Sequence, residues 1–120
     1  MPVGLNLDSG TSITNSLERY MDLVDARQKL VTSNIANADT PGYKTRDLDF
    51  KSQFQNLLDG GQPQAIEVSG LKTNNDGNNV NLDREAQLLS ENALRFNVAS
   101  QLMHGQISML KLAIDGGQGG

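Results

Sequence analysis

Two segments of this chain carry apolar residues at alternating steps of three and four, and this spacing limits the fold more than any other feature. Such steps give a repeat of about 3.5 residues, which keeps one face of a helix turned toward a partner helix. The spacing predicts helices over residues 13–38 and 82–114. The repeats run through Ile13, Leu17, Met21, Val24, Gln28, Val31, Ile35 and Ala38, and through Leu82, Ala86, Leu89, Ala93, Phe96, Ser100, Met103, Ile107, Leu110 and Ile114.

The apolar surface on both predicted helices is wider than a single seam between two helices can cover. A helix hairpin covers about two positions per heptad, whereas these helices offer closer to three. The surplus therefore has to be buried against the middle of the chain or against another chain. The residues that flank the two repeats are Leu23, Leu30, Leu88, Val98, Leu102 and Leu112.

The length of the second helix predicts a rod rather than a globule. At about 1.5 Å per residue this helix would be about 50 Å long, whereas a compact chain of this size is only about 35 Å across. We therefore expect a mainly α fold in a single elongated domain over residues 1–120. Gly105 is the expected weak point of the second helix, because an interior glycine costs about 1 kcal/mol relative to alanine.

The region from residue 39 to residue 81 is expected to begin with a turn. Pro41 lacks an amide hydrogen and biases Thr40 away from helical geometry, so the first helix should end just before it. Pro-Gly at the two central positions fits a type II turn, in which Gly42 has a positive φ. The sequence therefore predicts a sharp exit from the first helix.

A short helix and a loop are predicted to follow this turn. The spacing of the apolar residues predicts an amphipathic helix over residues 49–58, with Asp47 or Asp49 as its N-cap. Alternation around Ile66 gives a weak strand signal over residues 65–71, so at most one or two short strands are expected. Three further segments are predicted to be mobile or loose because they are polar or glycine-rich, namely residues 1–12, 72–79 and 115–120.

Composition excludes several classes of protein. The formal net charge of −4 comes without a cluster of lysines or arginines, which argues against nucleic acid or an anionic membrane surface as a partner. No apolar run is long enough to span a membrane, and the first residues lack the pattern of a cleaved signal peptide. Cysteine is absent and His104 is the only histidine, so no disulfide framework, thiolate nucleophile or multi-histidine metal site is expected.

Candidate catalytic and metal-binding residues are few. His104 is accompanied by no nucleophile motif and no acid constellation, so we interpret it as a solvent-facing or interface histidine. Asp47 and Asp49 supply too few oxygen ligands for a calcium site, and residues 76–79 lack the required bidentate glutamate. The sequence therefore predicts no enzyme activity, no metal and no cofactor.

Residues 34–44 stand out because two amides sit in the last turns of the first helix. Their poor helix propensity explains the end of the helix, but it does not explain their position on or beside the apolar seam. Asn34 and Asn37 are three residues apart, so they lie on one helix face. Amides there can bond to the turn or to a neighbouring subunit and fix the angle at which the chain leaves the helix.

The segment NIANADTPGYKTRDLDF, residues 34–50, resembles the signature of the bacterial flagellar axial proteins, the rod and hook family. The variant in this chain is similar to the proximal rod subunits of the basal body. The second half agrees, with Asn-Leu-Asp-Arg-Glu at residues 81–85 and Lys-x-Ala-Ile-x-Gly-Gly at residues 111–117. The resemblance covers about residues 15–58 and 78–117.

This resemblance implies a structural subunit without catalysis. Such subunits are exported through the flagellar type III apparatus without cleavage of a signal peptide, and they assemble helically in the basal-body rod that crosses the periplasm. Their terminal helices form the inner coiled-coil layer of a hollow shaft, which would cover the surplus apolar surface. The implied partners are copies of the chain, other flagellar rod proteins, and the ring and export-gate components at the rod base.

The leading hypothesis is a rod subunit that transmits torque from the motor to the hook by shape and packing. The alternative is a soluble helical adaptor or export chaperone for axial proteins, which would not need the Thr-Pro-Gly-Tyr turn. Under the leading hypothesis the isolated chain should be monomeric and partly disordered. The expected assembly residues are Leu17, Met21, Val24, Val31, Asn34, Ile35, Asn37, Thr40, Pro41, Gly42, Tyr43, Leu89, Phe96, Met103, Ile107 and Leu110.

Overall fold

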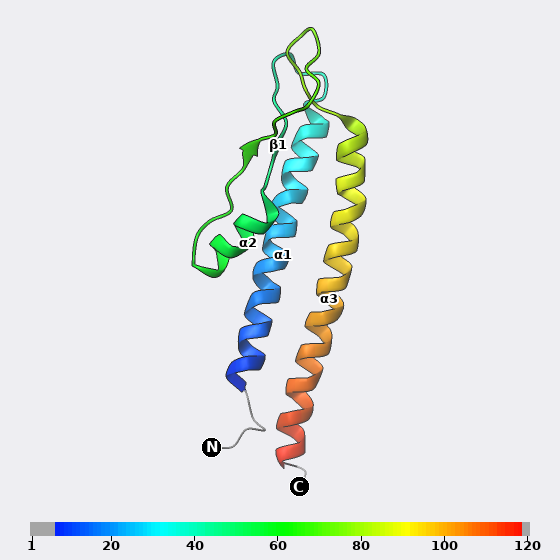
Figure 1. Cartoon of the computed structure of the whole chain (residues 1–120). Helices are drawn as coiled ribbons and strands as arrows, with labels where there is room; N and C mark the ends of the chain where they lie inside the picture. The colour runs from blue at the N-terminus through cyan, green and yellow to red at the C-terminus, as the bar shows by residue number, and fades with distance from the viewer. Residues whose placement is uncertain (1–6, 119–120) are drawn as a thin grey trace.

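The computed structural model describes residues 7–118, apart from the side chains of residues 7–11, 57–58 and 117–118. The molecule measures 71 × 25 × 16 Å. Two long helices run side by side in opposite directions, and a smaller lobe lies against one side of the first (Figure 1). The elements are α1 (Leu7–Ala36), β1 (Arg46–Asp47), α2 (Phe50–Leu58), β2 (Ile66–Glu67) and α3 (Leu82–Gln118). The predicted mainly α fold class is confirmed.

α1 differs from its predicted bounds at both ends. It begins at Leu7, so the looseness expected of residues 1–12 is wrong for residues 7–12, while residues 1–6 lie outside the described part of the chain. It ends at Ala36 rather than at residue 38. The Asn37 side chain donates to the carbonyl of Ser33 at 2.8 Å, and this bond caps the last turn.

α3 begins at Leu82 as predicted but continues to Gln118 instead of ending at residue 114. Residues 115–118 of the expected flexible tail are therefore helical, and residues 119–120 lie outside the described residues. Glycine disfavours a helix by only about 1 kcal/mol and removes no hydrogen bond, unlike proline. The helix accordingly runs on through the tail glycines, and it is continuous at Gly105 as well.

The exit turn and the short helix form as predicted. Gly42 has a φ of +77°, and the amide of Tyr43 donates to the carbonyl of Thr40 at 3.2 Å. The predicted helix over residues 49–58 is α2. Asp49, one of its two candidate caps, accepts a hydrogen bond from the Ser52 hydroxyl at 2.9 Å.

α2 covers one side of α1 through a small apolar and aromatic core. Leu23 of α1 and Leu48 are the buried centre of this core. The ring of Tyr20 meets those of Phe50 and Phe54 edge-on, with centroids 5.4 and 5.9 Å apart. Edge-on aromatic pairs are favourable beyond their buried area, so this contact fixes α2 on the first helix.

The two strands join the segment that precedes α2 to the segment that follows it. β1 pairs with β2 in antiparallel fashion, with Arg46 opposite Glu67. The amide of Val68 also donates to the carbonyl of Thr45 at 2.9 Å. The strand expected over residues 65–71 is therefore present but shorter.

Residues 72–79 differ from the mobile loop that their composition predicts. Asn78 and Asn79 are buried at the end of the helix pair. The Asn78 amide donates to the carbonyls of Asn37 and Thr40 at 2.9 and 2.8 Å. Hydrogen bonds from buried polar side chains thus fix this loop, which has no apolar side chains to bury. A hydropathy pattern does not reveal such contacts.

The seam between α1 and α3 also differs from the predicted repeat. Two polar side chains of α3 turn inward because they find partners on α1, Asn92 at the Val24 carbonyl and Glu85 at Asn34. The predicted repeat of α3, from Leu82 to Ile114, consequently lies alongside the seam, and several of its large members are exposed. The buried seam residues are Val24, Val31 and Asn34 on α1, and Glu85, Leu88, Asn92 and Ala99 on α3.

Candidate functional site

The end of the rod where α1 stops and α3 starts is organised around Asn34. Its Nδ2 donates to the Arg46 carbonyl at 2.8 Å and to Glu85 Oε1 at 2.7 Å. Its Oδ1 accepts from the Tyr43 hydroxyl at 2.9 Å and from the Arg46 amide at 3.1 Å. Because an asparagine side chain offers two donor hydrogens and two acceptor lone pairs, every one of them is used. One buried side chain thus joins α1, the exit turn, β1 and α3.

A cluster of four charges surrounds this hub. Arg27 of α1 holds Asp47 through two hydrogen bonds of 3.0 Å, one to each carboxylate oxygen. Arg84 of α3 bonds to Asp47 from the other side and reaches Glu85 Oε1 at 3.1 Å. A paired fork of this kind is geometrically specific as well as strong. The cluster therefore ties β1 to both long helices.

The two buried carboxyl groups have pKa values shifted in opposite directions. Burial raises the pKa of Asp47, but the hydrogen bonds from Arg27, the Leu48 amide and Arg84 outweigh burial, so the pKa lies below its usual value. For Glu85, burial is the largest effect and outweighs the bonds from Asn34 and Arg84, so its pKa lies above the usual value. Asp47 is the fixed anion of the cluster, and Glu85 is the group that takes up a proton first.

Hydrogen bonds join the exit turn, residues 40–43, to the middle loop, residues 72–79, next to Asn34. The Thr40 hydroxyl donates to Asn37 Oδ1 at 3.0 Å, and the amide of Gly42 donates to the Asp76 carbonyl at 2.9 Å. Gly77 approaches Gly42 so closely that an added Cβ would lie 3.2 Å from the Gly42 Cα. Any larger side chain at residue 77 would push the loop away from the turn.

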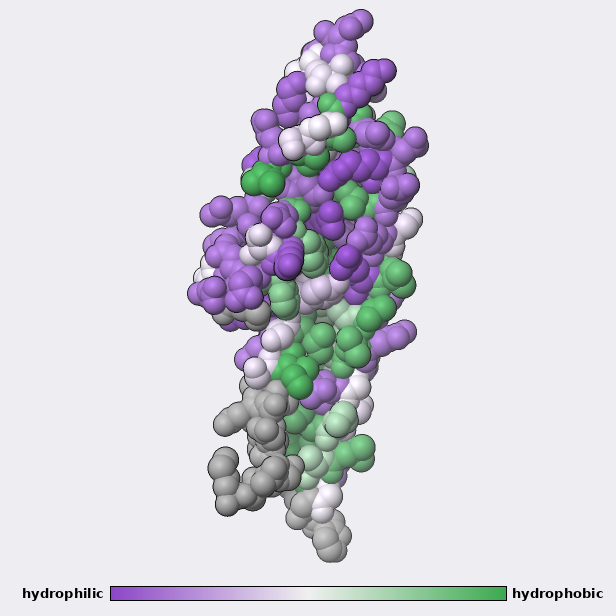
Figure 2. All heavy atoms as spheres, viewed as in Figure 1, coloured by the Kyte–Doolittle hydropathy of each residue, from purple (hydrophilic) through white to green (hydrophobic). Residues whose placement is uncertain are grey.

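The opposite end of the rod carries exposed apolar side chains instead of polar contacts. Hydrophobic residues gather on the lower half of the face shown in Figure 2, whereas hydrophilic residues dominate the upper end and the α2 lobe. Exposed apolar surface of this extent on a small chain marks an interaction site. The exposed large side chains of α1 and α3 in this half and at mid-height are Ile13, Leu94, Phe96, Val98, Leu102, Ile107, Met109, Leu112 and Ile114.

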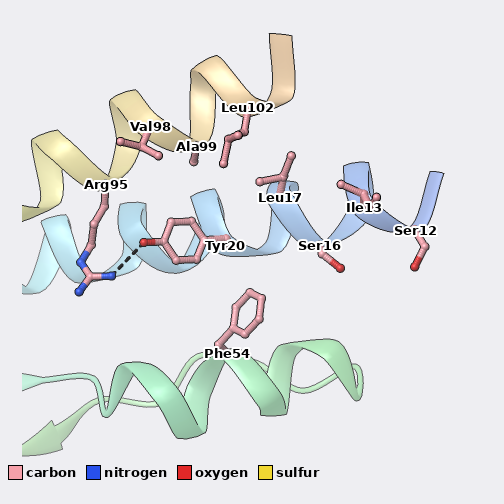
Figure 3. Close-up of a pocket in the computed structure, with 10 residues that line it drawn as sticks. All are labelled: Ser12, Ile13, Ser16, Leu17, Tyr20, Phe54, Arg95, Val98, Ala99 and Leu102. Carbon is pink, nitrogen blue, oxygen red and sulfur yellow. Dashed lines mark hydrogen bonds between the residues drawn. The ribbon is translucent and has the colours of Figure 1, made fainter. Parts of the chain in front are cut away.

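A largely apolar groove of about 400 Å³ lies on the α2 side of this half. Figure 3 shows Tyr20 and Phe54 facing each other at one end of the groove, where Arg95 donates to the Tyr20 hydroxyl at 2.9 Å. Leu17 of α1 and Leu102 of α3 line the other end. The groove offers apolar walls and one engaged cation, which suits an apolar side chain of another protein segment.

The structure divides the predicted assembly residues into four groups. Most of the exit-turn residues are tied together around the hub, as described for Asn34, Asn37, Thr40, Gly42 and Tyr43. Val24 and Val31 are buried inside the chain. The half-buried residues are Leu17, Met21, Leu89, Met103 and Leu110, and the exposed ones are Ile35, Pro41, Phe96 and Ile107.

Sequence reasoning missed the charged cluster and the buried loop asparagines. Arg27, Asp47 and Glu85 lie far apart along the chain and carry no motif that joins them. A usable signal existed for Glu85, because it precedes Leu88 by three residues and Asn92 by seven, which places all three on one helix face. Asn78 carries no comparable signal, since its partners are backbone carbonyls of another segment.

His104, the candidate catalytic residue of the sequence, is exposed on α3. Within residues 7–118, no group of three or more His, Cys, Asp or Glu side chains is placed to hold a metal ion. No helix in that range is long and apolar enough to cross a membrane. What the arrangement offers is a rigid polar junction and a pair of apolar helix faces.

Known proteins match this chain along most of its length. Residues 21–44 match the family model described as flagella basal body rod protein. The flagellar basal body rod protein FlgB of Bacillus subtilis is 30% identical over 138 aligned positions, which cover 95% of this chain and all of the relative. The FlgB proteins of Yersinia enterocolitica and Escherichia coli K12 are 30% and 28% identical, over 75% and 83% of this chain and 84% and 91% of their own lengths.

The matched segment includes the α1 and exit-turn residues of the junction. Residues 21–44 contain Arg27, Asn34 and the whole exit turn through Tyr43. The likeness to the Bacillus subtilis relative extends over both long helices, since it covers nearly the whole chain. The chain therefore belongs to the FlgB family of flagellar basal body rod proteins.

Proposed function

We propose that this chain is a structural subunit of the flagellar basal-body rod, which assembles helically through the apolar faces of its two long helices and transmits torque by packing. The observation that carries the proposal is the exposure of large apolar side chains along α3 in a chain of this family. Leu112, for example, is 70% exposed. Large exposed apolar surface of this kind marks a site where another protein packs.

The polar junction has a different role in this proposal. It fixes the angle between the exit turn, α2 and the two helices, so that each subunit presents its apolar faces in the same orientation. Regular orientation matters because a heterologous contact repeated at a constant angle generates an open helical assembly. The junction residues Asn34, Asn37, Thr40 and Tyr43 therefore act on assembly through the shape of the subunit.

The location and partners follow from the same proposal. The subunit resides in the rod of the basal body and reaches it by export without cleavage of a signal peptide. Its neighbours are copies of itself and other rod proteins, with ring and export-gate components at the rod base. The alternative, a soluble adaptor or export chaperone, would not need the Thr-Pro-Gly-Tyr turn, which hydrogen bonds join to α1 and to residue 76 in this structure.

A fractionation and motility experiment tests the proposal. The chain, or the variant Leu102→Asp/Leu112→Asp, is expressed in cells that lack it, and basal bodies are purified. The unaltered chain should restore motility and co-purify with basal bodies, whereas the variant should be absent from them. Both leucines are exposed, so the variant should still fold, which circular dichroism of the purified chain checks.

The matched control is Gln101→Asp/Ser108→Asp, at two exposed polar positions of the same helix. It adds the same two negative charges without removing large apolar side chains, so it should assemble like the unaltered chain. Recovery of the unaltered chain in the cytoplasm only, with none in basal bodies, would favour the adaptor instead.

A further inference from the structure

Three aspartates of this chain are followed directly by glycine, at residues 59–60, 76–77 and 115–116. In such a pair the backbone amide of the glycine can attack the aspartate side chain, because glycine carries no side chain to hinder ring closure. The carboxyl group has to turn toward the next amide, so the fold decides which pair reacts. The third pair lies in the last turn of α3, where helices fray, whereas the first two lie in turns outside the helices.

The two pairs in turns have nearly the same backbone conformation at the glycine. Gly60 has a φ of +92° and Gly77 a φ of +86°. Only glycine adopts such angles without strain, so each turn requires the residue that also permits ring closure. A difference in reactivity between Asp59 and Asp76 therefore has to come from their surroundings.

The surroundings of Asp76 hold both reacting groups in place. Asp76 Oδ1 accepts from the Asn78 amide at 3.0 Å, and the Gly77 amide donates to the Asn74 carbonyl at 2.9 Å. The Asp76 carbonyl also accepts from the Gly42 amide at 2.9 Å, and the Asn78 side chain is fully buried. The carboxylate can reach the amide nitrogen only when this anchored loop opens, and opening has a free-energy cost.

Asp59 lies in open surroundings. It follows the last residue of α2, and both Asp59 and Gly60 are exposed. In the part of the chain that the structure describes, the Asp59 carboxylate forms no hydrogen bond and no ion pair. An open groove of about 540 Å³ lies between this turn and α1, lined by Gly60 and Gly61 on one side and by Arg19 and Asp22 on the other. The Asp59 side chain therefore has room to turn toward the Gly60 amide.

We propose that Asp59 is a site of spontaneous isomerisation to isoaspartate, and that the anchored loop protects Asp76 from the same reaction. The Gly60 nitrogen forms a bond to Cγ of the protonated Asp59 carboxyl group, whose hydroxyl leaves as water with the amide proton. Water then opens the cyclic imide. Opening at the main-chain carbonyl gives isoaspartate, and opening at Cγ restores aspartate. Water is the only reagent, and the composition of the chain does not change.

Isoaspartate at residue 59 changes the turn that ends α2. The backbone then runs through the former side chain and is longer by one methylene group. In the unmodified turn the Gly61 amide donates to the Asn56 carbonyl at 2.8 Å, and Asn56 Nδ2 donates to the Gln62 carbonyl at 3.2 Å. A longer backbone alters both contacts, so we expect the last turn of α2 to loosen.

The modified turn also presents a new chemical group. The former main-chain carbonyl of residue 59 becomes a free carboxylate at an exposed position. Repair methyltransferases esterify this carboxylate of isoaspartate with S-adenosylmethionine, so an enzyme of that class is the partner that fits the site. The reaction is independent of the chain's place in the rod, so it goes beyond the proposed function.

Incubation of the purified chain at neutral pH and physiological temperature tests the proposal. Trypsin cleaves after lysine and arginine, which places Asp59 and Asp76 in separate peptides, residues 52–72 and 73–84. Chromatography with electron-transfer fragmentation detects isoaspartate in each, and so does methyl transfer by a purified repair methyltransferase. Isomerisation leaves the mass unchanged, which separates it from deamidation of Asn56. We expect isoaspartate to form at residue 59 at least about tenfold faster than at residue 76, a ratio that corresponds to an opening cost of about 1.4 kcal/mol.

Two comparisons show whether the fold causes this difference. In guanidinium chloride both aspartates should react at similar rates, because each precedes a glycine. Asn78→Ala removes the side-chain bonds to the Asn37 and Thr40 carbonyls and keeps residues 76–77 unchanged. This variant should isomerise faster at residue 76 and at the same rate at residue 59.

The matched control at the site itself is Asp59→Glu. It keeps the negative charge but cannot form the same ring, so residues 52–72 should stay unmodified. Equal rates at residues 59 and 76 in the folded chain, or a faster reaction at residue 76, would overturn the proposal. So would an absence of isoaspartate at residue 59 in the folded chain when it forms in guanidinium chloride. An Asn78→Ala variant without faster reaction at residue 76 would overturn the protection by the loop.

Discussion

The two ends of this rod are stabilised by different means. At the junction end, Asn34, Asp47 and Glu85 are buried and bonded to several segments of the chain. At the other end, α1 and α3 continue with apolar side chains that face water, among them Ile107 and Ile114. The polar groups of the junction find their hydrogen-bond partners within one chain. The far end keeps exposed apolar surface that other chains can cover.

The two ends therefore have different roles: the junction sets the shape of the subunit, and the far end provides surface for assembly. Hydrogen bonds are directional, so a network of them determines one arrangement of the exit turn and the lobe. Apolar contact is non-directional and proportional to area, so it suits a surface that completes its packing against neighbours. The subunit is thus expected to have a defined geometry at one end before it has a covered surface at the other.

Hydrogen exchange of the isolated chain should show the largest difference between the ends. Amides of residues 85–92 are expected to exchange roughly 100-fold more slowly than those of residues 107–114, because few buried contacts oppose opening of the far end. Mass spectrometry of exchanged peptides measures this. Equal protection along α3 would remove the contrast, and it would also contradict the expectation that the isolated chain is partly disordered.

Removal of the hub should give the largest effect of a single substitution. Asn34→Ala leaves the Arg46 amide and carbonyl, the Tyr43 hydroxyl and Glu85 without one partner each. We expect the free energy of unfolding to fall by about 3 kcal/mol, measured by urea denaturation. Each buried unsatisfied group costs about 1–3 kcal/mol, but the Tyr43 hydroxyl and Glu85 each keep another partner, in Ser33 and Arg84.

Asn75→Ala provides the comparison for this loss. It removes the same side chain from an exposed position of the middle loop, where a change within about 0.5 kcal/mol is expected. A loss of less than about 1 kcal/mol for Asn34→Ala would mean that water molecules replace the hydrogen bonds of the Asn34 side chain.

The pH dependence should distinguish the two buried carboxyl groups. Glu85 has a pKa raised by burial, so the cost of its ionisation is present above the folded pKa and is relieved as the pH falls toward the usual value of 4.5. The unaltered chain should therefore gain stability relative to Glu85→Gln as the pH falls from 7 toward 4.5, with no further gain below. Urea denaturation over this range measures the difference.

Asp47 should give the opposite sign. Its pKa is lowered despite burial, so its contribution is present above its usual value of 3.8 and is lost as the pH falls through the lower folded pKa. The Asp47→Asn variant should therefore be less stable than the unaltered chain near neutral pH. It should also lack the loss of stability that protonation of Asp47 causes at acid pH. Identical pH profiles for the two variants would contradict the assignment of opposite shifts.

The smallest effect is expected in the far half of α3. Gly105 lies inside the helix, and an added Cβ would meet nothing within 4 Å. Gly105→Ala should raise the stability by about 0.5–1 kcal/mol through helix propensity alone. Thermal unfolding followed by circular dichroism detects the change, and a decrease would show that the glycine is required for a close approach.

The sequence predicts the backbone of this molecule well and its tertiary polar contacts poorly. The apolar repeats predict both long helices because helical burial depends on spacing along one element, and Pro41-Gly42 predicts the exit turn because the local backbone geometry decides it. The repeat of α3 does not reveal that Glu85 and Asn92 face α1, since these polar side chains turn inward only in the presence of partners on α1. Such partners are a property of the folded chain, which no local pattern contains.

Asn34 also has a consequence for how relatives of this chain are to be compared. Aspartate at this position would lack both donor hydrogens, leucine would lack every polar group, and glutamine would carry the same groups one carbon too far out. A substitution at this position therefore affects four bonds at once. If relatives share this asparagine, an alignment alone would make it look like a catalytic residue, whereas in this chain it joins four segments.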